Sequence, residues 1–171
     1  MRVWLEQGPP VVYVNLGTLA IASKRQLIEM LQGLTSHSFR VLWVLKAAQA
    51  AALPRPLPAQ LRIEEWGPPP LSILSHPSVC AFVSHCGINS VYEAVHAATP
   101  IVGIPMLADQ RDMGARVADA GVGVCLDKTR FRSHDLRRAL ERVLQDRSFA
   151  TNLACLRQTV ANAGGTRRAA D

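Results

Sequence analysis

The residues best suited to chemistry lie between positions 76 and 110, where polar side chains follow two short apolar runs at 79–83 and 101–104. Both runs are too short for helices and indicate strands. The loop after the first run brings His85, Gly87, Asn89 and Ser90 to the start of an expected helix, 89–97. Because a helix N-terminus offers unpaired N–H groups and partial positive charge, this loop predicts a site for an anion such as phosphate.

Other side chains nearby are suited to the remaining parts of a nucleotide sugar. Trp66 stands beside Gly67 and a proline, so its indole face can meet a flat base. Glu93 lies one turn into the expected helix, where its carboxylate can accept hydrogen bonds from ribose hydroxyls. Asp109 and Gln110 begin the next helix, and a carboxylate beside an amide suits adjacent sugar hydroxyls. Together these residues predict a site for a nucleotide diphosphate sugar.

Simpler structural roles are open for the same residues. Asp109, and either Asn89 or Ser90, are good helix N-caps, and an isolated Trp66 is more often a core aromatic. The spacing of His76, His85 and His96 matches no zinc motif, so no metal site is expected. The ligand interpretation is favoured because so many of these residues follow the ends of strands.

The elements that must position these loops alternate along the chain. Besides the two runs above, strands are expected at 11–16, 39–45, 61–65 and 122–126. A helix is expected to begin after an N-cap at Ser23 and to end at residue 34, and further helices are expected at 71–75, 109–120, 133–145 and 148–163. The last helix is expected to end in a C-cap at Gly164-Gly165, and the segment 46–60 is expected to be an irregular connection. This pattern predicts an α/β fold, a Rossmann-like parallel sheet with helices on both faces. Ligands bind at the carboxyl ends of such strands, where Thr18 also lies.

Composition narrows the function classes. The chain has 171 residues, 49% hydrophobic and 19% charged, which is typical of one folded domain. No apolar run is long enough to span a bilayer, so no membrane segment is expected in this chain. The four cysteines show no C-x-x-C spacing and are interpreted as buried thiols. The net charge of +6 raises nucleic acid as a partner, but the arginines at 130–147 alternate with acids and lack aromatic neighbours, so none is expected.

These residues resemble the motif of the UDP-glycosyltransferase family of the GT-B fold, in its C-terminal donor-binding half. The resemblance covers nearly the whole chain and rests on Trp66-Gly67-Pro68, His85-Cys86-Gly87, Asn89-Ser90, Glu93-Ala94, Pro100, Pro105 and Asp109-Gln110. It implies that Trp66 stacks on uracil, that the Gly67 backbone binds the uracil edge, and that Glu93 holds the ribose. It further implies diphosphate contacts from Thr18, His85, Gly87, Asn89 and Ser90, and sugar contacts from Asp109 and Gln110. Pro69 stands where the family usually has glutamine, so one ribose contact is missing.

The resemblance also implies which part of the enzyme's function this chain carries out. The chain is expected to be a single donor-binding domain, with 1–8 a remnant of the interdomain segment, 9–165 the core and 166–171 a truncated tail. The N-terminal acceptor-binding domain, with the histidine and aspartate that activate the acceptor, is expected to be absent, so this half alone is expected to be inactive or nearly so. The intact enzyme would transfer a hexose from a UDP-sugar such as UDP-glucose to a hydroxyl of a small lipophilic acceptor, with inversion. His85 would stabilise the leaving diphosphate, and neither metal nor cofactor would be required.

One alternative to this function stays open at this point, and a second is disfavoured. The chain could be a non-catalytic donor-binding subunit that needs a separate acceptor-binding partner chain. A dinucleotide-dependent oxidoreductase on a similar sheet is disfavoured, since no G-x-G-x-x-G follows the first strand. A cytoplasmic location is expected for this piece, and a membrane-anchored full-length protein is compatible with the same residues.

Overall fold

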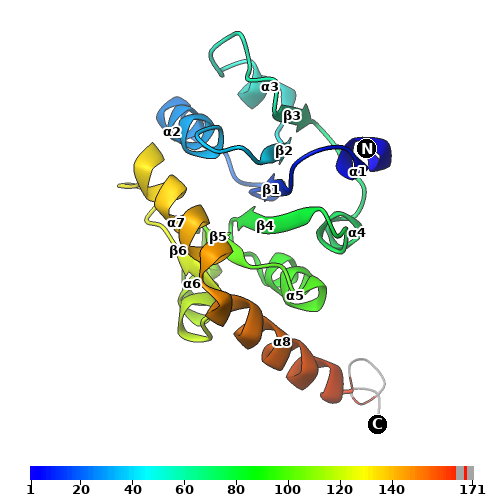
Figure 1. The fold of residues 1–171 in the computed structure, drawn as a ribbon. Helices are drawn as coiled ribbons and strands as arrows, with labels where there is room; N and C mark the ends of the chain where they lie inside the picture. Colours follow the sequence, from blue (N-terminus) through cyan, green and yellow to red (C-terminus); the bar gives the residue numbers. More distant parts are fainter. Residues whose placement is uncertain (165–167, 169–171) are drawn as a thin grey trace.

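The computed structural model describes residues 1–164 and 168, and a parallel sheet of six strands forms its centre (Figure 1). The strands are β1 (Val11–Asn15), β2 (Arg40–Val44), β3 (Leu61–Glu64), β4 (Val79–Ser84), β5 (Ile101–Gly103) and β6 (Gly123–Cys125). They lie in the order β3-β2-β1-β4-β5-β6. The central strands β1, β2 and β4 are mostly apolar, with polar residues at their ends, because helices cover the sheet on both faces. The expected Rossmann-like fold is confirmed.

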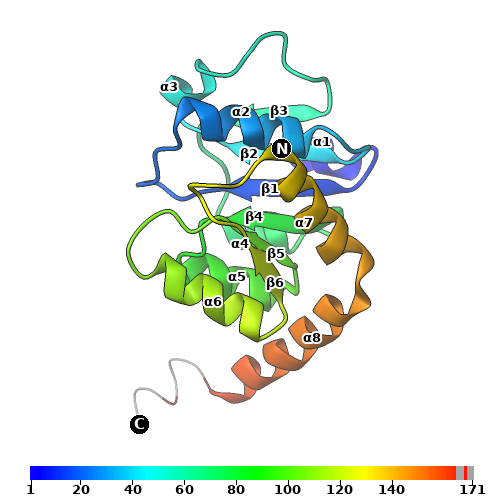
Figure 2. The ribbon, with the colours of Figure 1, turned by 90° about the vertical axis from the view of Figure 1, so that its left-hand side faces the viewer.

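Two sets of helices bury the two faces of the sheet (Figures 1 and 2). On one face, α2 (Lys24–Leu34) and α7 (Ser133–Gln145) pack together over one core cluster. On the other lie α1 (Arg2–Glu6), α4 (Pro70–Leu74), α5 (Ile88–Ala97) and α6 (Gln110–Asp119). The last helix, α8 (Arg147–Asn162), contributes Phe149 to the first cluster and Leu153 to the second. The central strands β1, β2 and β4 therefore have apolar cover on both faces, whereas the edge strand β3 (Leu61–Glu64) packs Leu61 and Ile63 on one face only.

Local signals explain where several helices begin and end. The hydroxyl of Ser23 accepts from the backbone N–H of Gln26, whose side chain accepts from Ser23 in return, as a capping box does. Asp146 caps α8, and Gly164 follows the end of that helix with a φ of +82°. This left-handed conformation confirms the expected glycine stop, and Gly165 lies outside the described residues.

Three sequence expectations differ from the structure. The connection 46–60 is not wholly irregular, because one helical turn, α3 (Ala47–Ala50), interrupts it. No element was expected at the N-terminus, where the buried guanidinium of Arg40 holds α1 by donating to the carbonyl oxygens of Trp4, Leu5 and Pro9. The interpretation of all cysteines as buried thiols is also wrong: only Cys86 is fully buried, and Cys155 is exposed.

Among the described residues, no helix is both long enough and apolar enough to cross a bilayer.

Candidate functional site

The site lies at the topological switch point of the sheet, between β1 and β4, where the order of successive strands reverses. From this pair the strand order runs outward to β3 on one side and to β6 on the other. The loops after β1 and β4 consequently leave the sheet in different directions and open a crevice at its carboxyl edge. The loop after β1 contains Gly17 and Thr18, and the loop after β4 contains His85, Cys86 and Gly87. Both loops were expected at this rim.

The imidazole of His85 fills the space between two glycines. A β-carbon at Gly17 would lie 2.8 Å from Nε2 of His85, and one at Gly87 would lie 2.4 Å from the same atom. Gly17 also has a φ of +78°, which disfavours any other residue there. The ring therefore contacts backbone from both loops of the crevice, which explains why glycine stands at both positions.

Burial governs the electrostatics of His85. Desolvation lowers the pKa of the imidazole, while the backbone of Asn15 and the carboxylate of Asp109 act in the opposite direction. Its Nδ1 is buried without a partner of hydrogen-bonding geometry among the described residues. At neutral pH the ring is therefore uncharged, and an anion bound beside it would favour the protonated form.

The N-terminus of α5 faces the same crevice. Its N-cap is Gly87 in an extended conformation, with no side-chain cap, so the alternative role of Asn89 or Ser90 as the cap of this helix is wrong. The side chain of Asn89 is exposed, that of Ser90 is partly exposed, and neither forms a hydrogen bond within the described part of the chain. Both remain available as donors beside the N–H groups of the first helical turn.

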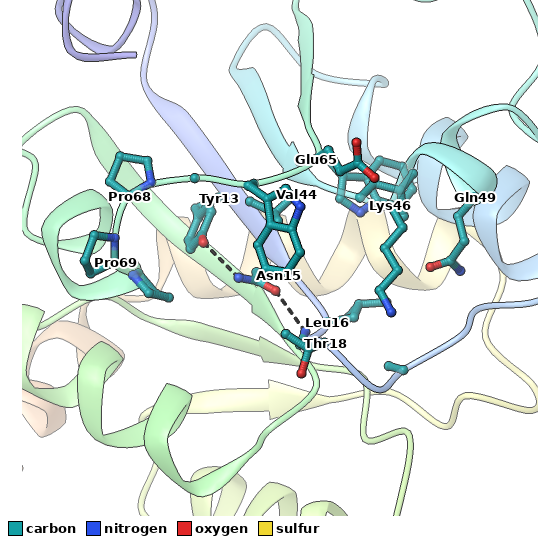
Figure 3. A pocket seen from close by; sticks show the side chains of 17 residues that line it. Tyr13, Asn15, Leu16, Thr18, Val44, Lys46, Gln49, Glu65, Pro68 and Pro69 are labelled. Atoms are coloured by element: carbon teal, nitrogen blue, oxygen red, sulfur yellow. Dashed lines mark hydrogen bonds between the residues drawn. The ribbon is translucent and has the colours of Figure 1, made fainter.

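A cavity of about 380 Å³ adjoins the crevice, over the ends of β1, β2 and β3 (Figure 3). Thr18, Trp66 and Gly67 line it, as do Lys46 and Pro69. The side chain of Trp66 is 74% exposed, so its interpretation as a core aromatic is wrong, and Trp43 is the tryptophan that packs in the core. An exposed indole beside a cavity of this size can stack on a flat ring.

Asn15 organises the wall between the cavity and the crevice, and sequence reasoning missed it. Its Nδ2 donates to the phenol oxygen of Tyr13 at 2.9 Å, and its Oδ1 accepts from the N–H of Gly17 at 2.8 Å (Figure 3). These two bonds hold the start of the loop that carries Thr18. The available signal was an amide as the last residue of a strand, directly before Leu16-Gly17-Thr18.

Glu93 reaches toward this wall from α5. Burial raises the pKa of its carboxyl group. Burial also raises the pKa of Tyr13 to about 12, against the effect of the Asn15 hydrogen bond, and the charge of Glu93 adds to the increase. The expected ribose ligand therefore lies within electrostatic reach of the floor of the cavity.

The third loop, between β5 and α6, brings the expected sugar ligands to the rim. Asp109 stands at the N-cap of α6, but its exposed side chain makes no capping bond, so a capping role is wrong. Oε1 of Gln110 accepts from the N–H groups of Met106 and Leu107, both at 2.8 Å, which leaves its amide nitrogen as the free donor. Ala108, at a φ of +43°, adopts a conformation that is unfavourable for alanine.

The predicted residues thus fall into connected groups. Thr18, Trp66 and Gly67 share the cavity, His85 joins them through Gly17, and Asp109 is close enough to His85 to affect its pKa. Asn89, Ser90 and Gln110 do not line the cavity and lie in the first turns of α5 and α6. Lys46, two residues after the end of β2, places a cation on the cavity wall that sequence reasoning did not identify.

Sequence comparison identifies a family and individual relatives that this chain is similar to. The family described as UDP-glucoronosyl and UDP-glucosyl transferase matches residues 6–160. The chain is 36% identical over 124 residues to UDP-glycosyltransferase 84A3 of Arabidopsis thaliana, covering 68% of this chain and 26% of the relative. It is 39% identical over 102 residues to the ecdysteroid UDP-glucosyltransferase of Lymantria dispar multicapsid nuclear polyhedrosis virus, covering 60% and 20%. The chain therefore spans about a quarter of the length of these curated relatives.

Solved structures agree with this assignment. Os79 of O. sativa in complex with UDP superposes with a TM-score of 0.84 at 30% identity, covering 91% of this chain and 37% of Os79. The UDP-glucose: anthocyanidin 3-O-glucosyltransferase in complex with UDP gives a TM-score of 0.85 at 27% identity, covering 95% and 39%. With the sheet order, the glycine-seated His85 and the match over residues 6–160, the chain belongs to the UDP-glucoronosyl and UDP-glucosyl transferase family.

Proposed function

We propose that this chain binds the UDP-sugar donor of an inverting UDP-glycosyltransferase and forms its C-terminal half. The observation that carries the proposal is the position of His85, between Gly17 and Gly87 at the mouth of α5 and next to a cavity of about 380 Å³ with an exposed Trp66. An anion site and a stacking surface side by side match a nucleoside diphosphate. The complexes of similar chains with UDP support the same ligand.

In this proposal, each part of the donor has its own binding residues. Trp66 stacks on uracil, and the backbone of Gly67 binds its edge. Glu93 accepts from the ribose hydroxyls. The diphosphate lies at the α5 N-terminus, where it receives hydrogen bonds from Thr18, His85, Gly87, Asn89 and Ser90. Asp109 and the free amide N–H of Gln110 bind the transferred hexose.

The chemical role of these groups is to stabilise the departing diphosphate. The acceptor oxygen attacks the anomeric carbon while the bond from that carbon to the phosphate oxygen breaks, which inverts the configuration. Negative charge grows on the diphosphate at that moment. In this proposal the N–H donors of the α5 N-terminus and the His85 imidazole are held at that position in advance, so they stabilise the transition state more than the bound donor, without a metal ion. The base that activates the acceptor belongs to the proposed N-terminal half.

The exposed apolar side chains at the rim support a second candidate. Leu19 is 80% exposed and Ile21 77% exposed in the loop after β1, and Ile88 and Leu107 are about half exposed. Such side chains are suited to contact another domain. They fit an acceptor-binding half on the same polypeptide, and equally a non-catalytic donor-binding subunit that pairs with a separate acceptor-binding chain. Intact-mass analysis of the natural product and co-purification distinguish these arrangements.

The test of donor binding is isothermal titration with UDP, UDP-glucose and UDP-glucuronate, first with a chelator and then with Mg²⁺. We expect metal-independent binding of UDP whose affinity changes with the attached sugar. ADP is the matched control ligand, since it carries the same diphosphate on a different base. Equal affinity for ADP and UDP would contradict recognition of uracil, and failure of all three uridine ligands with folded protein would overturn the proposal.

A further inference from the structure

Two cysteine sulfurs meet above one glycine beneath the candidate anion site. Gly103 of β5 pairs in register with Ser84 of β4 and with Cys125 of β6. A β-carbon at Gly103 would lie 2.5 Å from Sγ of Cys86 and 2.5 Å from Sγ of Cys125. The two sulfurs therefore lie within twice that distance of each other, in the volume that any other side chain at position 103 would occupy.

The two thiols are hydrogen bonded in series. The Cys86 thiol donates to the sulfur of Cys125. The Cys125 thiol in turn donates to the carbonyl oxygen of Gly114, with an Sγ–O distance of 3.1 Å. The hydrogen bond from Cys86 lowers the pKa of Cys125, and the same bond with burial raises the pKa of Cys86. Cys125 is thus the thiol that ionises first, with Cys86 held protonated against it.

Only one of the two thiols is accessible to a reagent. Cys86 is fully buried, whereas Cys125 is partly exposed and lines a hollow of about 290 Å³. Arg111 and Lys128 line the same hollow together with Asp127. A small oxidant can therefore reach Cys125 from solvent more readily than the buried Cys86.

We propose that Cys125 and Cys86 form a peroxide-reactive dithiol whose oxidation to a disulfide alters the segment 84–90, which comprises the end of β4, the loop 85–87 and the start of α5. The Cys125 thiolate attacks one peroxide oxygen, so that an S–O bond forms, the O–O bond breaks and hydroxide leaves. The Cys86 sulfur then attacks the Cys125 sulfur, the S–O bond breaks, and the hydroxyl group leaves as water with the Cys86 proton. Two thiols lose two electrons, and one peroxide is reduced to two waters.

The position of Cys86 makes this bond consequential. Cys86 stands between His85 and Gly87 with a φ of +61°, a conformation that is unfavourable for cysteine. Its sulfur must move to bonding distance of a residue on β6, and a loop yields more readily than a strand in the sheet. Formation of the disulfide therefore displaces the backbone that holds the His85 ring in place. The predicted effect on UDP rests on the proposed function, whereas formation of the bond does not.

The experiment oxidises the native-sequence chain with hydrogen peroxide, blocks remaining thiols under denaturing conditions, and maps the cysteine peptides by mass. We expect a loss of two hydrogen atoms, a Cys86–Cys125 crosslinked peptide, and recovery of both thiols with dithiothreitol. Cys125→Ser should abolish the crosslink, while Cys155→Ser, which removes the exposed thiol of α8, should retain it. Full labelling of both Cys86 and Cys125 after peroxide treatment would overturn the proposal.

The effect of disulfide formation on residues 84–90 is measured in a separate experiment. Hydrogen exchange of residues 84–90 should change on oxidation and return on reduction, whether or not UDP binds. UDP affinity should fall about tenfold in the oxidised chain. A confirmed crosslink with unchanged exchange over 84–90 would refute the effect on the loop. Failure of the reduced chain to bind UDP would instead count against the proposed function.

Discussion

Nε2 of His85 lies only 2.8 Å from the position that a β-carbon of residue 17 would occupy, so residue 17 has room only for glycine. His85 follows β4, and Gly17 follows β1. These residues are far apart in the sequence and meet because β1 and β4 are neighbours in the sheet. The relationship makes the glycine a binding determinant although it has no side chain of its own. Its consequence can be tested without altering any polar group.

Gly17→Ala should displace the His85 ring and weaken UDP binding about tenfold or more. The left-handed φ adds a stability cost of about 1–2 kcal/mol. Gly121→Ala is the matched control, since Gly121 also has a positive φ, of +62°, and its added β-carbon would approach Nδ2 of Asn152 to 2.4 Å. The control should lose comparable stability in urea denaturation and keep its UDP affinity. Equal losses of affinity would mean that general destabilisation explains both.

Stability should depend on pH through His85. Because burial lowers the pKa of the folded imidazole, the unfolded chain takes up this proton first as the pH falls. The contribution of this site to the free energy of unfolding is therefore largest above the ordinary histidine pKa and declines as the pH falls below it. Urea denaturation between about pH 7 and pH 5 should show a shallower decline for His85→Gln than for the original chain. Identical slopes would show that the imidazole titrates alike in both states.

The fold and most of the site loops were predictable because their signals are local. Short apolar runs mark strands that are buried on both faces, and turn residues after them mark the ligand edge. The Ser23–Gln26 capping box could likewise be predicted from neighbouring residues. What could not be predicted depends on contacts between distant segments: the seat of His85 on Gly17, and the N-terminal helix held by Arg40.

The errors at helix starts have a related cause. Asn89, Ser90 and Asp109 are residue types that commonly cap helices, yet none forms a capping bond here. The N-cap of α5 is Gly87, and His85 leaves no room for a capping side chain at that position. Capping propensity describes isolated helices, whereas the position of the loop is set by packing across β1 and β4.

Trp66→Ala separates binding from stability. The indole is 74% exposed, so its removal should change the free energy of unfolding by no more than about 0.5 kcal/mol. Loss of stacking on uracil should weaken UDP binding about tenfold in calorimetry. Trp66→Phe retains a flat ring and should recover most of the affinity. If the alanine variant binds UDP as tightly as the original chain, the indole does not contact the base.

Asp109→Ala tests recognition of the sugar. Its exposed carboxylate makes no capping bond, so its removal should leave α6 intact and weaken UDP-glucose binding severalfold more than UDP binding. Asp112→Ala is the control, because Asp112 is also exposed in the first turn of α6. It carries the same charge away from the loop and should change the two affinities little. Equal losses for UDP and UDP-glucose in Asp109→Ala would refute the sugar contact.

Pro69→Gln should strengthen donor binding. Pro69 lines the cavity and precedes α4 with φ −49° and ψ 133°, an extended conformation that glutamine adopts readily. The carbonyl oxygen of residue 69 accepts from the N–H and hydroxyl of Ser72, and the substitution keeps both bonds. A glutamine amide would add a hydrogen bond to the ribose, worth about 1 kcal/mol, and tighten UDP binding about fivefold. Pro69→Leu, which removes the proline ring without adding a polar group, is the control. If both variants alter the affinity equally, loop flexibility explains the change and no ribose contact has been gained.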